Sequence, residues 1–79
     1  MYVKLFAGLR EAAGSDRITV QLPAGATVAD LVAALGRDFP AIAPLLGSVR
    51  VAVNQGFADP ATVLHEADEV AAIPPVSGG

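Results

Sequence analysis

One amphipathic helix near the middle of the chain constrains the fold more than any other feature of its 79 residues. Thr27 is a good N-cap, and Asp30 stands three positions later, as in a capping box. The apolar positions at i, i+3, i+4 and i+7 are Val28, Leu31, Val32 and Leu35. We expect Gly36 to stop this helix and Pro40 to prevent its continuation. A helix with one apolar stripe needs one apolar surface to cover it.

Segments with alternating polar and apolar residues flank the helix and predict that this surface is a small sheet. The expected strands are residues 2–7, 17–22, 49–53 and 68–73. "GLREAAG" predicts a helical turn that closes at Gly14, "AIAPLL" predicts another short turn, and "NQGFADPATVL" predicts an outward loop. The first and last strands are the most apolar, so we expect them to lie side by side and parallel at the sheet centre.

The order strand, strand, helix, strand, strand predicts an α+β fold, the ubiquitin-like β-grasp. Its mixed sheet of four to five strands would pack on one main helix. The length is that of one domain, so we expect residues 1–79 to form a single domain, with residues 74–79 as an extended C-terminal tail.

Composition and charge narrow the possible functions. The chain has no cysteine, so it has no thiol nucleophile or thiolate ligand of its own. Its formal net charge is −3 and its five basic residues are spread singly, which argues against nucleic-acid binding and favours a basic partner surface. No apolar run reaches membrane-spanning length and the start lacks a leader pattern, so a cytoplasmic protein without membrane contact is expected.

No catalytic constellation is visible in the sequence. His65, the only histidine, stands beside Glu66 in an expected turn, where it should be solvated. Asp68 and Glu69 are adjacent, so a strand would point them to opposite faces. No serine has a basic neighbour in sequence and no glycine motif fits a phosphate loop, so we expect no metal site and no permanently bound cofactor. The reactive group that remains is the carboxylate of Gly79.

The final residues "IPPVSGG" have a physical interpretation. Pro74 and Pro75 fix φ and cannot donate to a sheet, so they end the last strand and direct the following residues outward. Residues 74–79 can span up to roughly 20 Å. Gly78 and Gly79 carry no side chains and could enter a channel that a Cβ would block. This arrangement suits delivery of a carboxyl group into another protein's active site; the alternative is an inert tail.

Three segments carry a family resemblance. "LFAGLRE" (5–11), "VAVNQ" (51–55) and "DEVAAIPPVSGG" (68–79) resemble the small sulfur-carrier subunit of molybdopterin synthase. The Pro-Pro-Val-Ser lead-in is the most specific part, because related carriers for thiazole synthesis share Gly-Gly but usually lack it. One departure concerns a turn: "HEADE" (65–69) stands where the family usually has a glycine just before Asp-Glu.

The resemblance implies a role in molybdenum cofactor biosynthesis. An E1-like adenylating enzyme would use ATP to adenylate Gly79, and a sulfur donor such as a persulfide-bearing sulfurtransferase would convert it to a thiocarboxylate. The large, catalytic subunit of the synthase, in a heterotetramer, would then transfer the sulfur to a cyclic pyranopterin monophosphate to form a dithiolene. This chain would thus be a non-catalytic sulfur-donor subunit. The residues inserted into the partner would be Pro74, Pro75, Val76, Ser77, Gly78 and Gly79.

By the same resemblance, Phe6, Phe57 and Ile73 would form a hydrophobic patch that docks the activating enzyme and the synthase. Phe6 alternates with the inward side chains of its strand, so it should point away from the helix. Arg10 could form a salt bridge with a partner, whereas Asn54 is expected to order its own loop.

Three other functions remain open. The chain could be a ubiquitin-like modifier whose tail becomes amide-linked to lysines, and Lys4, its only lysine, would then be the single branch point for chains. It could carry sulfur for thiamine or another sulfur-containing product. It could also be a plain β-grasp interaction domain with an inert tail.

Overall fold

The computed structural model describes residues 1–75, and residues 76–79 lie outside the described part. Its strands are β1 (Tyr2–Leu5), β2 (Arg17–Thr19), β3 (Arg50–Val53), β4 (Gly56–Phe57) and β5 (Val70–Ile73). Its helices are α1 (Ala7–Ala13), α2 (Val28–Asp38) and the short 3-10 helix η1 (Ala43–Ser48).

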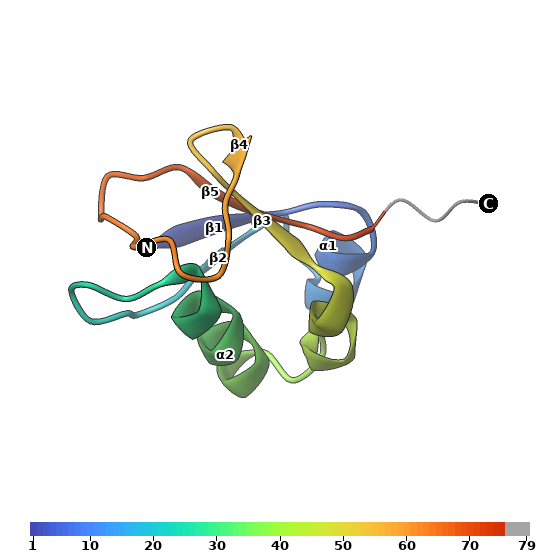
Figure 1. Cartoon of the computed structure of the whole chain (residues 1–79). Helices are drawn as coiled ribbons and strands as arrows, with labels where there is room; N and C mark the ends of the chain where they lie inside the picture. Colours follow the sequence, from blue (N-terminus) through green and yellow to red (C-terminus); the bar gives the residue numbers. More distant parts are fainter. Residues whose placement is uncertain (76–79) are drawn as a thin grey trace.

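The five strands form one mixed sheet in the order β2-β1-β5-β3-β4. β1 and β5 are parallel neighbours, with Val3 opposite Val70 and Leu5 opposite Ala72, while the other pairs are antiparallel. α2 lies against one face of this sheet, and the described chain ends on the side of α1, away from the N-terminus (Figure 1). The predicted ubiquitin-like β-grasp and its central parallel pair are therefore confirmed.

The core lies between α2 and the inward face of the sheet. Leu31 and Leu35 of α2 are fully buried, together with Val3 of β1, Ala72 of β5 and Ile42 from the segment before η1. Within residues 1–75 no polar or charged side chain is buried. Apolar burial therefore stabilises this fold without any internal polar network to be satisfied.

The predicted capping box is present at the start of α2. The Asp30 amide donates to Thr27 Oγ1 over 3.3 Å, and the Thr27 amide donates to Asp30 Oδ2 over 2.9 Å. These two bonds satisfy backbone donors that the first turn of a helix leaves free. The buried face of α2 differs from the predicted apolar stripe at one position. Ala34 is buried, whereas Val32 is only half-buried.

The expected stop at Gly36 is wrong, because α2 continues to Asp38. The helical backbone hydrogen bonds continue past this glycine, and the Phe39 amide donates to the Leu35 carbonyl over 2.9 Å. A Cβ at Gly36 would lie 3.4 Å from Leu46 Cδ1 of η1. η1 therefore packs beside Gly36 at a distance that leaves room for ordinary contact with an added methyl group.

Gly14 ends α1 as predicted. It has φ +75° and its amide donates to the Arg10 carbonyl over 3.0 Å, a left-handed cap that glycine adopts without strain.

The expected strand 17–22 is shorter in the structure. β2 ends at Thr19, and the Val20 amide makes one further bond to the Met1 carbonyl. β1 begins at Tyr2, so the residues after Val20 have no neighbouring strand backbone to pair with.

The expected outward loop after β3 begins as a hairpin. Asn54 and Gln55 have φ of +51° and +72°, the left-handed values of a tight two-residue turn that matches the twist of paired strands. This turn brings Gly56 opposite Val53 and Phe57 opposite Ala52. The short β4 was not predicted, and the last strand begins at Val70, two residues later than expected.

No helix in the described residues, 1–75, has the length and apolar character needed to cross a membrane.

Candidate partner-docking site

The outward face of the sheet carries a shallow hollow of about 240 Å³. Lys4 and Ala71 contribute to it from the two central strands, where they alternate with the buried side chains of the core. Its lining residues are Lys4, Phe6, Ala52, Gln55, Phe57, Glu69, Ala71 and Ile73. We call this the sheet-face hollow.

The three side chains of the expected hydrophobic patch all line the sheet-face hollow. Phe6 follows β1 directly and is 45% exposed; Phe57 is brought in by the β3–β4 hairpin and is 57% exposed. Ile73 ends β5 and is half-buried. The expectation that Phe6 points away from the core is confirmed by its exposure. The docking role of this patch stays a prediction.

Arg10 lies beside the sheet-face hollow and not in it. It lines a second hollow of about 430 Å³, together with Asp16, Arg17, Lys4, Phe6 and Leu5. Lys4 and Phe6 belong to both hollows, so the two form one continuous surface. We call the second one the β1–β2 hollow.

Arg50 borders this surface and was missed from the sequence; it also lines a neighbouring hollow with Val28 and Pro60. Its guanidinium carbon lies 4.0 Å from the centroid of the Phe57 ring, a cation–π contact, and its Cα is paired with that of Ile73. The alternation in "VRVAV" could have revealed it, because Val51 is buried on the core side and its neighbour Arg50 must therefore face outward.

Ala52 and Ala71 form the floor of the sheet-face hollow. They are paired across β3 and β5, and their small side chains leave room between the larger side chains around them. Lys4 and Glu69 form an exposed ion pair at 3.7 Å on the same face. The hollow is thus apolar at its centre and charged at its border.

Asn54 orders its own turn, as expected. Its Nδ2 donates to Asp68 Oδ1 over 2.9 Å, and its Oδ1 accepts from the Glu69 amide over 2.9 Å. Asp68 Oδ2 also accepts from the His65 amide over 2.8 Å. Both hydrogen bonds lower the pKa of the Asp68 carboxyl below its usual value. The bond from the His65 backbone amide has the larger effect, and the bond from the Asn54 side chain has the smaller one.

The turn "HEADE" does not require the family's usual glycine. The Asp68 amide donates to the His65 carbonyl over 3.0 Å to close the turn, and none of the residues between them has positive φ. Ala67 therefore stands where the family usually has glycine, and it does so without backbone strain.

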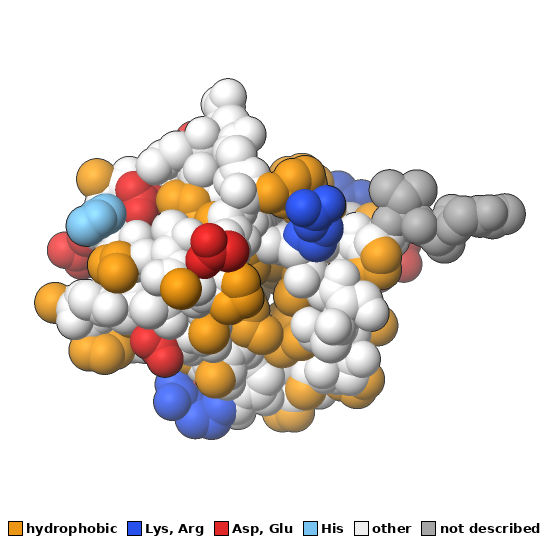
Figure 2. Space-filling model, in the orientation of Figure 1, with side chains coloured by type: hydrophobic (Ala, Val, Ile, Leu, Met, Phe, Trp, Pro, Cys, Tyr) orange, Lys and Arg blue, Asp and Glu red, His pale blue; other side chains and the backbone are white. Residues whose placement is uncertain are grey.

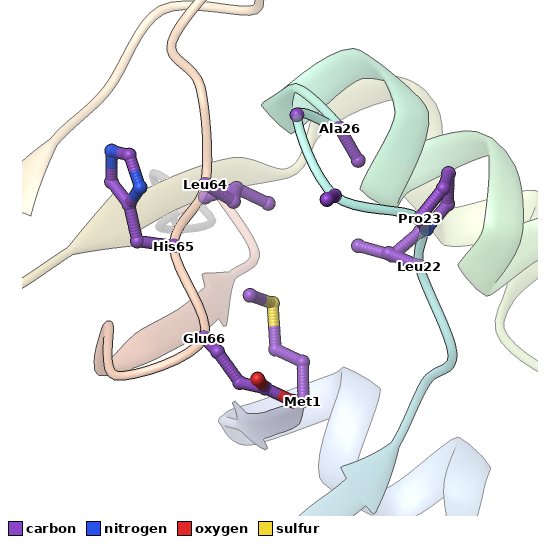
Figure 3. Close-up of a pocket in the computed structure, with 9 residues that line it drawn as sticks. Met1, Leu22, Pro23, Ala26, Leu64, His65 and Glu66 are labelled. Atoms are coloured by element: carbon purple, nitrogen blue, oxygen red, sulfur yellow. The ribbon is translucent and has the colours of Figure 1, made fainter.

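A hollow of about 250 Å³ opens at the other end of the sheet, between the loop before α2 and the segment before β5 (Figure 3). Met1, Leu22 and Leu64 point toward it, whereas the exposed His65 points away (Figure 3). Among residues 1–75 no group of three His, Cys, Asp or Glu side chains could hold a metal. None of the described site residues predicted from the sequence lines this hollow.

β5 leads directly from the sheet-face hollow to the tail. Ile73 lines the hollow, Pro74 is half-buried and Pro75 is exposed. The other expected tail residues, Val76, Ser77, Gly78 and Gly79, lie outside the described residues.

Curated relatives resemble the chain over almost its full length. It is 34% identical to a molybdopterin synthase sulfur carrier subunit from Arabidopsis thaliana, with 98% of this chain and 80% of the relative covered. It is 40% identical to a protein of the same name from Mycobacterium tuberculosis, with 98% and 94% covered.

A solved structure supports the same relationship. SAMP1 from Haloferax volcanii superposes with a TM-score of 0.85 at 35% identity, covering 99% of this chain and 97% of that one. Residues 3–79 match the model of the ThiS family. The chain therefore belongs to the ThiS family, and its resemblance to the small sulfur-carrier subunits of molybdopterin synthase is confirmed.

Proposed function

We propose that this chain is the sulfur carrier, the small subunit, of a molybdopterin synthase in molybdenum cofactor biosynthesis. One observation carries the proposal: in a ThiS-family chain, β5 runs from an exposed aromatic hollow straight into Pro74 and Pro75. The names of the curated relatives support the same function.

In this proposal Gly79 is the reacting residue. Its carboxylate attacks the α-phosphorus of ATP on an E1-like adenylating enzyme, which releases pyrophosphate and leaves an acyl-adenylate. Hydrosulfide then displaces AMP and leaves a thiocarboxylate; where the donor is a persulfide, its outer sulfur displaces AMP and a second thiol reduces the resulting acyl disulfide to the thiocarboxylate. ATP is consumed by the enzyme and is not a resident cofactor of this chain.

Two thiocarboxylated carriers each donate one sulfur to a cyclic pyranopterin monophosphate in the large subunit to form the dithiolene of molybdopterin, and water releases each Gly79 as the free carboxylate. The catalytic acid and base groups belong to that subunit, and residues 1–75 of this chain hold no metal-ligating cluster that would replace them. Because the chain has no cysteine, no internal thiol can intercept the activated glycine. We place this chemistry in the cytoplasm, in a heterotetramer of two small and two large subunits.

The sheet-face hollow is the proposed docking surface for both partners in turn. Phe6 and Phe57 are exposed aromatic side chains, the type of residue that dominates binding energy at interfaces. Full burial of each is worth about 1.5–3 kcal/mol. Docking there would place Pro74 and Pro75 at the edge of the interface, from which the tail could enter the partner.

Intact mass spectrometry tests the carrier function. The chain is incubated with ATP, a sulfur donor and the adenylating enzyme from the same organism. The expected result is the mass gain of one oxygen-to-sulfur exchange, mapped to Gly79 and absent without ATP. No gain with a demonstrably active enzyme would refute the proposal. Formation of the dithiolene with the large subunit then separates this carrier from one that serves thiamine or another product.

A protein-modifier function is the second candidate, and the similarity to a solved structure named small archaeal modifier protein 1, from Haloferax volcanii, favours it at 32% identity. It requires the same activated Gly79 but a different product, an amide bond to a lysine of a target. Higher-mass adducts that resist thiol reagents, in place of the sulfur exchange, would establish it.

A further inference from the structure

The surface around the root of the tail is basic, although the chain as a whole is acidic. Eight acidic residues outnumber five basic ones over the sequence. In the two joined hollows the balance is reversed: Lys4, Arg10 and Arg17 line them, Arg50 stacks on Phe57 at their border, and the acidic side chains are Asp16 and Glu69. In Figure 2, basic side chains lie next to hydrophobic ones close to where the described chain ends.

Three of these four basic side chains lack an acidic partner. Within residues 1–75 the salt bridges are Lys4 with Glu69 and Arg37 with Asp38, so Arg10, Arg17 and Arg50 form none there. Arg17 and Arg50 instead rest on the aromatic rings of Tyr2 and Phe57, at 4.8 Å and 4.0 Å. A guanidinium over a ring still presents N–H donors to a carboxylate.

Two of these positive charges, on Lys4 and Arg17, lie next to each other across neighbouring strands. Lys4 of β1 and Arg17 of β2 are direct cross-strand partners in an antiparallel pair, and both line the β1–β2 hollow. Like charges in such a pair are unfavourable. Glu69 pairs with Lys4, and Asp16 lines the same hollow, so a carboxylate from outside the chain would offset the repulsion that remains and would be attracted by Arg10 at the same time.

We propose that the joined hollows bind an acidic protein surface, with carboxylates of the partner on Arg10, Arg17 and Arg50 around its apolar contact with Phe6 and Phe57. This inference rests on the proposed function, which supplies the partners: the adenylating enzyme and the large synthase subunit. It reverses the expectation from net charge, because an interface experiences the local field and not the total charge.

Association kinetics with the adenylating enzyme and the large subunit of the same organism test the proposal. At low ionic strength Arg17→Gln and Arg50→Gln should each slow association about two- to tenfold, and added salt should remove the difference. Arg37→Gln is the matched control, since it changes net charge equally but lies on α2 in a pair with Asp38. Melting temperatures confirm that all variants are folded.

The outcomes separate the two proposals. Binding of the native chain, with equal rates for Arg17→Gln and Arg37→Gln, would overturn the acidic-partner inference and leave the carrier function standing. Faster association of Arg17→Gln would point to a basic partner and also overturn it. Failure of the native chain to bind either protein would count against the carrier function.

A second measurement decides the charge question without those partners. A hexaglutamate peptide is titrated into the labelled chain and followed by amide NMR shifts. We expect shifts near Lys4, Arg10 and Arg17 and none near Arg37. Equal shifts at Arg37 would overturn the proposal, as would larger shifts with inorganic phosphate at matched ionic strength, which would indicate a small-anion site.

Discussion

Asn54 Nδ2 donates a hydrogen bond to Asp68 Oδ1 at 2.9 Å, and this bond ties the β3–β4 turn to the residues that lead into β5. The backbone N–H of Asn54 also donates to the Glu69 carbonyl over 2.7 Å. One residue thus fixes the hairpin that carries Phe57 and the start of the strand that leads to the tail.

Replacing Asn54 should therefore destabilise the fold in a graded way. Asn54→Ala loses the side-chain bonds and keeps an unfavourable φ of +51°, so it should lower the free energy of unfolding by about 2 kcal/mol. Asn54→Gly loses the same bonds but relieves the backbone, so it should cost less. Urea unfolding of both variants measures this, and an equal loss in the two would show that the backbone conformation carries no strain.

Asp68 should contribute a pH-dependent part of the stability. Its pKa is lowered in the folded chain, first by the His65 amide and then by Asn54. A group with a lowered folded pKa adds stability above its unfolded value of about 3.9, and this is lost as the pH falls through the folded pKa. Asp68→Asn should thus be less stable than the native chain at neutral pH and lose less stability below about pH 4.

Asp38 provides the control for this titration. Its pKa is also lowered, by the adjacent Arg37, but the two are sequence neighbours on an exposed helix end and can interact in the unfolded chain. Asp38→Asn should change the acid limb of the stability curve less than Asp68→Asn. The reverse order would contradict the role given to Asp68.

Leu31 should be among the most costly residues to truncate. It is fully buried, so Leu31→Ala should reduce the free energy of unfolding by about 2–5 kcal/mol. Leu45→Ala removes the same atoms from η1 at a position that is 40% exposed, so its cost should be clearly smaller. Similar losses for both in chemical denaturation would place the core elsewhere.

Phe6 and Phe57 should matter for binding and not for folding. Phe6→Ala and Phe57→Ala should leave the melting temperature nearly unchanged and weaken binding to the adenylating enzyme about 10- to 100-fold. Val63→Ala is the matched control, because Val63 is an apolar side chain that is 45% exposed, as Phe6 is, but lines neither hollow. Unfolding of Phe6→Ala would contradict its assignment to the outer face.

Gly36→Ala should stabilise the chain by about 0.5–1 kcal/mol. Gly36 lies within α2 without positive φ, and an added Cβ would meet Leu46 at ordinary contact distance. A left-handed helix stop at this residue would instead make alanine destabilising. Thermal unfolding distinguishes the two by the sign of the change.

Much of the framework was predictable because it depends on local patterns. The capping box at Thr27, the left-handed cap at Gly14 and the outward position of Phe6 follow from residue type and periodicity over a few positions. The parallel central pair followed from the high apolar content of its two strands and the crossover between them.

The candidate site was only partly predictable. The sequence supplied Phe6, Phe57 and Ile73 through a family resemblance, and the structure brings all three to one hollow. Arg50 was missed because its importance depends on Phe57, which reaches it through a tight turn at Asn54 and Gln55. Neither residue favours left-handed backbone as strongly as glycine, so the turn left a weak signal.

The sequence by itself thus determined every element except β4, though not all of their ends, since periodicity and capping act between residues a few positions apart. Only the tertiary structure decided where α2 ends, since the helix runs through Gly36 to Asp38, beside Leu46 of η1. It also decided the charge of the proposed docking surface. The fold brings Lys4 of β1, Arg10 of α1 and Arg17 of β2 to one hollow and stacks Arg50 of β3 on Phe57 next to it, and no count of charges along a chain contains that arrangement.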